Sequence, residues 1–273
     1  MKSSKPLQNK VAIVTGASRE IGAEMAFQLA QAGASVAIAH YGEPDLAQQT
    51  AQRIQGAGGT AVVIESDGRQ VSECYALVDK TVQAFGRVDI LAANAGITRF
   101  GKFLEFDEAT YDAVMDTNLK GSFFLAQAVA KQMAQQGKTE GGYRMVFSSS
   151  VVGQVGVPTM TAYGITKIGV SYLAKSLGVA LAPQGITANA LIIGAVVNAR
   201  NLADDPHYAE NFGRILPIGR AIYPSDVAAA LMYLVSPAAS AVTGHSLAVD
   251  GGHTLTVASS GSPQTNDEAA RKP

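Results

Sequence analysis

The 273 residues suffice for a large buried core, and 47% hydrophobic side chains against 16% charged ones exclude an intrinsically disordered chain. The 21 Lys and Arg residues almost balance the 22 Asp and Glu residues, so the net charge of -1 gives no general attraction to nucleic acid or to anionic membranes. We therefore expect neither kind of partner.

The cysteine content and the apolar pattern exclude further classes. Cys74 is the one cysteine, so no disulfide can form within the chain, and no cluster of Cys and His has the spacing of a metal site. No run of about 18 apolar residues occurs, and no apolar segment follows the polar start of the sequence. These features predict a soluble, cytoplasmic protein that binds no metal.

Short β-branched runs alternate along the chain with longer segments whose apolar residues recur at helical spacing. Strands are predicted over residues 11–14, 36–39, 61–64, 89–93, 144–148, 186–191 and 246–249. The first helix places Ile21, Met25 and Leu29 on one face and ends at Gly33. Further helices are predicted over residues 46–55, 71–85, 108–115, 118–135, 163–181 and 226–235, the last capped by Ser225.

Strands that are separated by helices need crossover connections, which predicts a parallel sheet covered by helices on both faces. The expected fold class is α/β, with one doubly wound, Rossmann-type domain over residues 1–257 and a seven-stranded sheet. Residues 194–220 lack a clear period and follow the sixth strand, where such folds bind ligands, so they form a candidate substrate lid. Residues 258–273 are rich in Ser, Gly and Pro, and we expect them to be disordered.

A glycine-containing turn, Thr-Gly-Ala-Ser-Arg-Glu-Ile-Gly at residues 15–22, connects the first strand to the first helix. Glycine lets a ligand approach the backbone, and the N–H groups at the positive end of the helix can bind a pyrophosphate. Two glycines would also fit a simple tight turn. The strand before the turn and the helix after it favour a dinucleotide site.

At this turn the sequence resembles the short-chain dehydrogenase/reductase family, whose fingerprint is Thr-Gly-x-x-x-Gly-x-Gly. Glu20 replaces the middle glycine, and we expect its carboxylate to turn outward and leave the site intact. The resemblance covers residues 10–254. After the sixth strand, Ile193 and Asn198 stand where the family usually has Pro and Thr, although Asn198 can make the same hydrogen bonds.

The resemblance implies a cofactor site assembled from the ends of the strands. Its expected members are Gly16, Ser18, Arg19, Ile21, Gly22, His40, Tyr41, Asp67, Gly68, Asn94, Ala95, Gly96, Tyr163, Lys167, Gly194, Val196 and Asn198. Among them, Asp67 matches the family's adenine-contacting Asp, and residues 94–96 match the end of its Asn-Asn-Ala-Gly motif.

The choice of cofactor depends on the end of the second strand. His40 and Tyr41 stand there, where NAD enzymes commonly carry an acid that binds the ribose 2′-hydroxyl. Because Arg19 offers a cation for a 2′-phosphate, NADP(H) is favoured. NAD(H) stays possible, since Glu43 could fold back to take the role of the acid.

Tyr163 and Lys167 are four residues apart on a predicted helix and therefore share one face. A free phenol has a pKa of about 10, too high for ready proton exchange near neutral pH. An ammonium about 4 Å away favours the phenolate by about 4 kcal/mol at an effective dielectric constant near 20. An isolated Tyr-x-x-x-Lys pair would more often be a chance amphipathic pattern.

The resemblance adds two residues to this pair. Ser150, thirteen residues before Tyr163 and just past the fifth strand, matches the family's Ser that hydrogen-bonds the substrate oxygen. Asn118 matches the helix Asn that holds a water of the proton relay. Ser148 and Ser149 compete for the Ser role, but the spacing to Tyr163 favours Ser150.

These residues lead to three functional hypotheses. The favoured one is an NADPH-dependent reductase of a ketone or 3-oxo group with Asn118, Ser150, Tyr163 and Lys167 as its catalytic residues. The alternative enzyme is an NAD-dependent alcohol, sugar or polyol dehydrogenase on the same scaffold. A non-catalytic dinucleotide sensor is the third, although a sensor would not need the complete catalytic set. The resemblance also implies a homotetramer and a small carbonyl or alcohol substrate.

Overall fold

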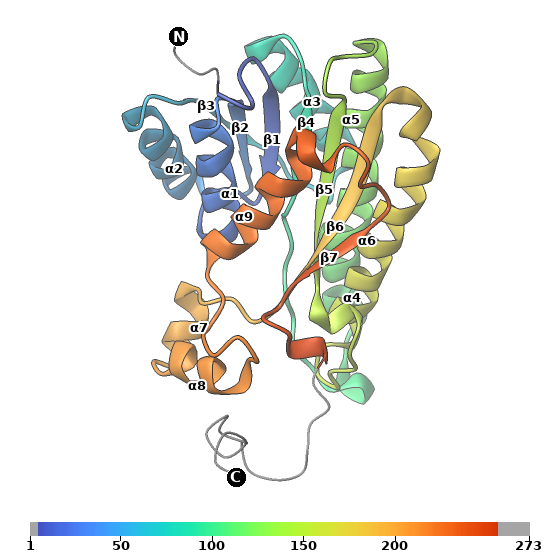
Figure 1. The fold of residues 1–273 in the computed structure, drawn as a ribbon. Coiled ribbons are helices and arrows are strands. Elements are labelled where there is room, and N and C mark those ends of the chain that lie inside the picture. The colour runs from blue at the N-terminus through green and yellow to red at the C-terminus, as the bar shows by residue number, and fades with distance from the viewer. Residues whose placement is uncertain (1–4, 256–273) are drawn as a thin grey trace, which may run out of the picture.

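The structure is a computed structural model that describes residues 5–255, and it contains one seven-stranded sheet of order β3-β2-β1-β4-β5-β6-β7 (Figure 1). The strands are β1 Val11–Thr15, β2 Ser35–His40, β3 Thr60–Glu65, β4 Ile90–Ala93, β5 Tyr143–Ser150, β6 Ile186–Ile193 and β7 Ser246–Val249. Every neighbouring pair is parallel. The predicted α/β fold is confirmed.

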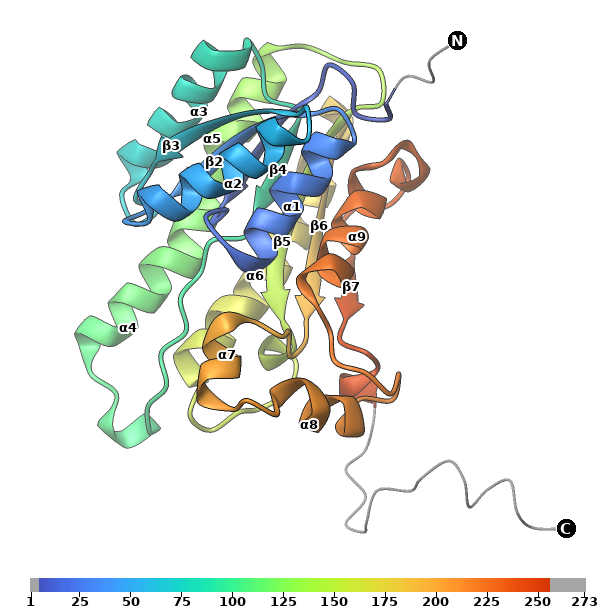
Figure 2. The ribbon, with the colours of Figure 1, turned by 90° about the vertical axis from the view of Figure 1, so that its left-hand side faces the viewer.

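Helices cover both faces of the sheet (Figures 1 and 2). One layer contains α1 Glu20–Gln31, α2 Pro44–Gly56 and α9 Pro224–Val235, and the other contains α3 Val71–Phe85, α5 Gly121–Gln135 and α6 Thr161–Ala180. In β1, Ala12 and Val14 pack against the first layer, whereas Ile13 packs against the second. This alternation explains why the strands are almost continuously apolar, since both faces of a parallel sheet are buried.

Several elements begin or end one to three residues from their predicted limits, and three of these differences concern Ser150, Asn118 and the start of α9. β5 extends to Ser150, because pairing with β6 continues to that residue, so Ser150 ends the strand instead of following it. The helix predicted from Asn118 is preceded by α4 Glu108–Met115 and a π-helical turn, Asp116–Lys120, that contains this asparagine. The predicted cap of α9, Ser225, lies inside the helix, and Tyr223 is the N-cap because Pro224 occupies the first turn.

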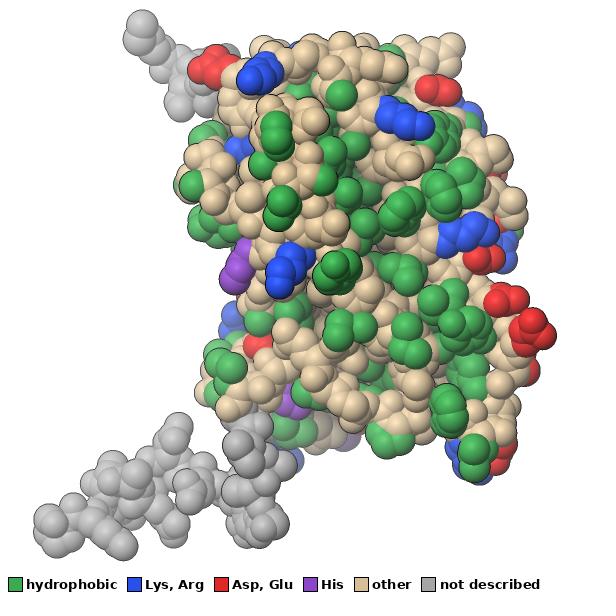
Figure 3. Space-filling view, turned by 90° about the vertical axis from the view of Figure 1, so that its right-hand side faces the viewer, with side chains coloured by type: hydrophobic (Ala, Val, Ile, Leu, Met, Phe, Trp, Pro, Cys, Tyr) green, Lys and Arg blue, Asp and Glu red, His purple; other side chains and the backbone are tan. Residues whose placement is uncertain are grey.

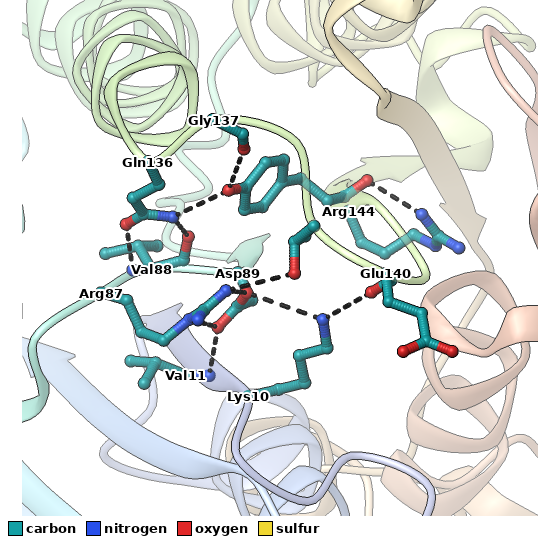
Figure 4. Close-up of polar contacts among 11 residues, drawn as sticks. Lys10, Val11, Arg87, Val88, Asp89, Gln136, Gly137, Glu140 and Arg144 are labelled. Carbon is teal, nitrogen blue, oxygen red and sulfur yellow. Dashed lines mark hydrogen bonds and ion pairs between the residues drawn. The ribbon is translucent and has the colours of Figure 1, made fainter.

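A polar network holds the amino ends of the central strands together (Figure 4). Asp89, which is 1% exposed, accepts hydrogen bonds from the Val11 N–H at 2.9 Å and from the Arg87 guanidinium at 2.6 and 2.8 Å. Lys10 Nζ lies 3.8 Å from the same carboxylate. A buried carboxylate needs such partners to offset its desolvation. This network lies at the end of the sheet away from the carboxyl ends of the strands.

The candidate lid forms two short helices, α7 Ala199–Asp204 and α8 Tyr208–Ile215. They lie beside the arrowheads of β5, β6 and β7, which mark the carboxyl ends of these strands (Figure 2). The expected disordered tail, residues 258–273, lies outside the described residues. Within residues 5–255, no helix is long and apolar enough to span a membrane, and no group of three or more His, Cys, Asp or Glu is placed to hold a metal.

Candidate active site

The glycine turn between β1 and α1 is closely packed. Gly16 has φ +61°, a backbone conformation that favours glycine. At Gly22, a Cβ would lie 2.1 Å from the Gly16 carbonyl oxygen and 2.8 Å from Asn94 Nδ2. Asn94 Nδ2 in turn donates to the carbonyl oxygens of Thr15 at 3.2 Å and of Gly16 at 3.4 Å. The turn therefore has no room for side chains at its two glycines, as a seat for a dinucleotide requires.

Thr15 connects this turn to the end of β4. Its Oγ1 accepts from the N–H groups of Asn94 and Ala95, each at 3.0 Å. Asn94 Oδ1 accepts from Ser148 Oγ at 3.0 Å. These bonds join the carboxyl ends of β1, β4 and β5, which places three of the predicted cofactor residues beside the predicted catalytic strand.

Arg19 and Ser18 both contact Glu43, the N-cap of α2. Arg19 Nη2 lies 2.9 Å from Glu43 Oε1, and Ser18 Oγ donates to Glu43 Oε2. The carboxylate thus folds back onto the glycine turn. Arg19, predicted to receive a 2′-phosphate, already has an anionic partner in this structure.

A second Arg-acid pair lies beyond β3. Asp67 Oδ2 lies 2.8 Å from Arg69 Nη2, which also donates to the Tyr41 hydroxyl at 3.0 Å. The hydrogen bonds from Arg69 hold the pKa of Asp67 below its ordinary value. His40, by contrast, is 5% exposed, and its Nδ1 has no hydrogen-bond partner among the described residues. Asp67 and Tyr41 therefore form one cluster through Arg69, and His40 is buried beneath the surface.

Lys167 is held close to Tyr163 on α6. It is 5% exposed, and its Nζ donates to the Ser148 carbonyl oxygen at 2.8 Å. The same Nζ lies 5.3 Å from the centroid of the half-buried Tyr163 ring. The ammonium of Lys167 therefore lies beside the Tyr163 ring on one face of α6.

The three consecutive serines of β5 have different partners. Ser148 Oγ donates to Asn94, and Ser149 Oγ donates to the Lys167 carbonyl oxygen at 2.8 Å. Ser150 Oγ accepts from the Val152 N–H at 3.3 Å, and within residues 5–255 no acceptor is found for its hydroxyl proton. Ser150 is therefore the one of the three whose O–H is left to donate to a ligand.

Asn118 is 1% exposed and clamps the loop after β4. Its Oδ1 accepts from the Ile97 N–H at 2.8 Å, and its Nδ2 donates to the Ile97 carbonyl oxygen at 2.9 Å. Its own carbonyl oxygen accepts from Ser122 Oγ at 2.7 Å. The π-helical turn places this side chain, as such turns often do at functional sites.

Gly96 lies where the predicted cofactor loop meets two of the predicted catalytic residues. A Cβ at this position would lie 3.2 Å from Asn118 Oδ1 and 3.4 Å from Lys167 Nζ. The backbone of the Asn94-Ala95-Gly96 segment therefore lies directly over Lys167. Gly96, Asn118 and Lys167, which come from three separate regions of the chain, therefore lie close together.

The candidate lid begins with three more of the predicted cofactor residues. At Gly194, a Cβ would lie 2.8 Å from Asp250 Cα. Val196 pairs with Ile222 in a parallel bridge. Asn198 is the N-cap of α7, and its Oδ1 accepts from the Asn201 N–H at 2.8 Å. The first polar side chain of the lid thus stabilises the lid helix itself.

Glu20 differs from its expected placement. Its carboxylate reaches the lid, where Oε1 accepts from the Ala199 N–H at 3.0 Å. The side chain is half-buried and bridges two segments, whereas the prediction was a side chain turned outward. The backbone of Glu20 has φ +53°, as a glycine at this position would.

The chain is similar to known proteins over most of its length. Residues 16–254 match the family model described as Enoyl-(Acyl carrier protein) reductase. The chain is 39% identical to an L-rhamnose 1-dehydrogenase (NAD(P)(+)) of Azotobacter vinelandii, over 90% of this chain and 97% of that protein. It is 36% identical to a 3-oxoacyl-[acyl-carrier-protein] reductase of Staphylococcus aureus, over 89% of this chain and 97% of that protein.

A solved structure matches over the same range. The short chain dehydrogenase from Burkholderia cenocepacia in complex with NADP has a TM-score of 0.84 and 32% sequence identity, over 91% of this chain and 99% of that chain. The chain belongs to the short-chain dehydrogenase/reductase family. It is an NAD(P)-dependent oxidoreductase that acts on CH–OH groups.

Sequence reasoning missed several residues of this short-chain dehydrogenase/reductase site. Arg69 was not predicted, although it contacts both Tyr41 and Asp67. Asp250 was assigned no role, although its buried carboxylate accepts from the Gly252 N–H at 2.9 Å and from Thr254 Oγ1 at 2.6 Å. Burial acts to raise the pKa of Asp250, but these hydrogen bonds lower it below its ordinary value. The position of Arg69 two residues after Asp67 was a usable signal, because the two charges lie in one turn.

Proposed function

We propose that this protein reduces a ketone or 3-oxo group to a secondary alcohol with NADPH as the preferred hydride donor. The observation that carries the proposal is the buried ammonium of Lys167 beside the Tyr163 ring. Ser150, at the end of the strand that Lys167 contacts through the Ser148 carbonyl oxygen, adds a hydroxyl proton with no acceptor among the described residues. A proton donor and a hydrogen-bond donor are what a developing alkoxide needs.

The residues present fit a nicotinamide dinucleotide. The cradle at Gly16 and Gly22 would be filled by any Cβ, and the backbone at Gly96 closes over Lys167. These residues, with Ile21 and Ala95, would hold the pyrophosphate and the nicotinamide ribose. When bound, the cofactor supplies the hydride that adds to the carbonyl carbon.

The side chains of the chain supply the other half of the reaction. Tyr163 gives its phenolic proton to the substrate oxygen as the hydride reaches the carbon, so the C=O bond becomes CH–OH. Ser150 donates a hydrogen bond to the same oxygen. Lys167 stabilises the phenolate that remains, and Asn118 positions the loop at Ile97 and orders the water that returns the proton.

The experiment that tests this proposal is a panel of ketones, 3-oxo thioesters and sugars, assayed with NADPH, NADH, NADP⁺ and NAD⁺ by nicotinamide absorbance. Reduction of ketones or 3-oxo thioesters with NADPH supports the proposal. Cofactor binding with no turnover of any substrate in the panel would favour the dinucleotide sensor instead.

A second candidate function is favoured by the polarity of the lid. α7 and α8 expose Arg200, Asp204, Glu210 and Arg214, and the relative that is 39% identical is an L-rhamnose 1-dehydrogenase. An NAD(P)-dependent sugar or polyol dehydrogenase would use the same four catalytic residues in the oxidative direction. Oxidation of aldoses in the panel, without reduction of 3-oxo thioesters, would establish this alternative.

Glu43 supports use of both cofactors, with NADP(H) preferred. Its carboxylate can accept from a ribose 2′-hydroxyl, and its partner Arg19 can bind a 2′-phosphate when the pair opens. Glu43→Gln removes the negative charge and frees Arg19, so the ratio of kcat/KM for NADPH over NADH is expected to rise about 10-fold. Glu24→Gln, which breaks the comparable Arg53–Glu24 pair at 2.8 Å, is the matched control. An unchanged ratio in Glu43→Gln would refute this role.

We infer a homotetramer from the surface of α6. Its outer face exposes Ile165, Ile168, Tyr172 and Val179, by 47%, 58%, 71% and 76%. Hydrophobic side chains gather on this side of the molecule (Figure 3). Exposed apolar patches of this kind are typical of contacts between subunits. Light scattering at micromolar concentration would show four chains per particle, and a monomer would contradict the inference.

A further inference from the structure

Glu20 occupies an unfavourable backbone conformation. Its φ of +53° lies in the left-handed region, and in the described part of the chain Asn9 is the other non-glycine residue with a positive φ. A residue with a Cβ is disfavoured there relative to glycine. Residues held in such conformations are concentrated at functional sites, where surrounding contacts maintain them.

In this conformation, the Glu20 side chain of the glycine turn contacts the backbone of the lid. Glu20 Oε1 accepts from the Ala199 N–H at 3.0 Å, and the two residues are 179 positions apart. The hydrogen bond that Asn198 accepts from Asn201 lies within the lid. Of these two hydrogen bonds, the one that Glu20 accepts links the glycine turn to the lid, whereas the one that Asn198 accepts stabilises the lid helix.

The lid helix is also tied to the segment before it, because Asn201 Nδ2 donates to the Val196 carbonyl oxygen at 3.1 Å. None of its residues is buried. The segment just before it is fixed, because Val196 pairs with Ile222 and the Val197 N–H donates to the Ile222 carbonyl oxygen at 2.8 Å. Segments with few buried apolar contacts open at low free energy, so one charged hydrogen bond has a large effect on the position of α7.

We propose that Glu20 is a positioning residue that holds α7 closed over the seat of the dinucleotide. This inference rests on the proposed function for what the lid covers. The glycine turn and residues 194–198 border the cofactor site from two sides, and the Glu20–Ala199 contact joins them. Without the carboxylate, α7 moves away from the turn and the cofactor dissociates faster. Ser150, Tyr163 and Lys167 lie on other elements, so the chemical step is unchanged.

Four variants test this role. Glu20→Ala removes the acceptor and keeps the strained Cβ, whereas Glu20→Gly removes the acceptor and relieves the strain. Glu20→Gln keeps an oxygen that can accept from Ala199. Asn9→Gly relieves the same kind of strain away from the site and is the matched control.

Hydrogen exchange of the cofactor-free proteins measures directly how well the Glu20–Ala199 hydrogen bond protects the start of α7. In the peptide covering residues 195–203, exchange is expected to be about 5-fold faster in Glu20→Ala and Glu20→Gly than in the wild type. Asn9→Gly should exchange like the wild type, and Glu20→Gln, whose neutral oxygen accepts a weaker hydrogen bond, should lie between the wild type and Glu20→Ala. If Glu20→Ala folds poorly, Glu20→Gly still measures the effect of losing the acceptor. Equal exchange in Glu20→Gly and the wild type overturns the proposal.

Kinetics with NADPH supply the second readout. The KM for NADPH is expected to rise about 5-fold in Glu20→Gly while kcat stays within about 2-fold of the wild type. A fall in kcat at constant KM overturns the positioning role. The exchange result stays interpretable if no substrate is turned over, so failure of the proposed function can be distinguished from failure of this inference.

Discussion

Replacing Lys167 with Met removes the ammonium beside the Tyr163 phenol and keeps a side chain of similar length. The ammonium lies 5.3 Å from the ring centroid. General acid–base catalysis by a positioned side chain contributes about 100-fold to 10,000-fold in rate, and Tyr163 depends on the ammonium for this role. Some of the resulting loss in rate is offset because the buried ammonium no longer has to be desolvated. We therefore expect kcat for alcohol oxidation at pH 7 to fall about 100-fold.

The assay follows formation of the reduced nicotinamide over a range of pH. The rate of Lys167→Met should depend more steeply on pH than that of the wild type between about pH 7 and pH 9, because the variant lacks the ammonium beside the phenol. Lys175→Met, which removes an exposed lysine two turns further along α6, is the control and should keep wild-type rates. A Lys167→Met enzyme within about 5-fold of the wild type, or with the same pH profile, would refute the reasoning.

Three further predictions concern the cofactor seat, the turn after β7 and the cysteine. Gly22→Ala places a Cβ 2.1 Å from the Gly16 carbonyl oxygen, so NADPH binding, measured by fluorescence, should be lost. The control is Gly56→Ala, whose Cβ has no atom within 4 Å, and this variant should bind NADPH like the wild type. Asp250→Asn should lower the Tm by about 5 °C at pH 7. Because the pKa of Asp250 is lowered in the fold, its contribution to stability is present above the ordinary value of 3.8 and is lost as the pH falls below that value. The difference in Tm between the variant and the wild type should therefore shrink in acid, and a constant difference would contradict the assignment. Burial raises the pKa of the Cys74 thiol to about 11, so a thiol reagent at pH 8 should label the unfolded protein but not the native one, and rapid native labelling would show that α3 opens.

The parallel sheet and the two helix layers could be predicted because each strand is a short apolar run and each helix has an apolar stripe. The order of the strands in the sheet was not predicted. Strand ends were less predictable, since they depend on pairing between distant segments. β5 reaches Ser150 because its pairing with β6 continues to Ile193. The cap of α9 was misplaced because Ser225 suits an N-cap, whereas Pro224 fits the first turn and moves the cap to Tyr223.

In the candidate site, too, local patterns were predictable from the sequence and contacts between distant segments were not. The spacing of Tyr163 and Lys167 is local and sets one helix face, so it was visible in the sequence. The spacing to Tyr163 favoured Ser150 over its two neighbours, but the partners of those neighbours, Asn94 and Lys167, come from other elements and were visible only in the structure. The contact of Glu20 with the lid joins residues 179 positions apart, and no spacing rule encodes it.

The most direct test of the central claim is the turnover of Tyr163→Phe beside its affinity for NADPH. The claim is that the Tyr163 phenol transfers the proton while the glycine turn and the Asn94–Gly96 loop hold the cofactor. We predict that kcat falls about 1,000-fold while the Kd for NADPH stays within about 2-fold of the wild type. A variant that keeps more than about a tenth of wild-type turnover would contradict the account.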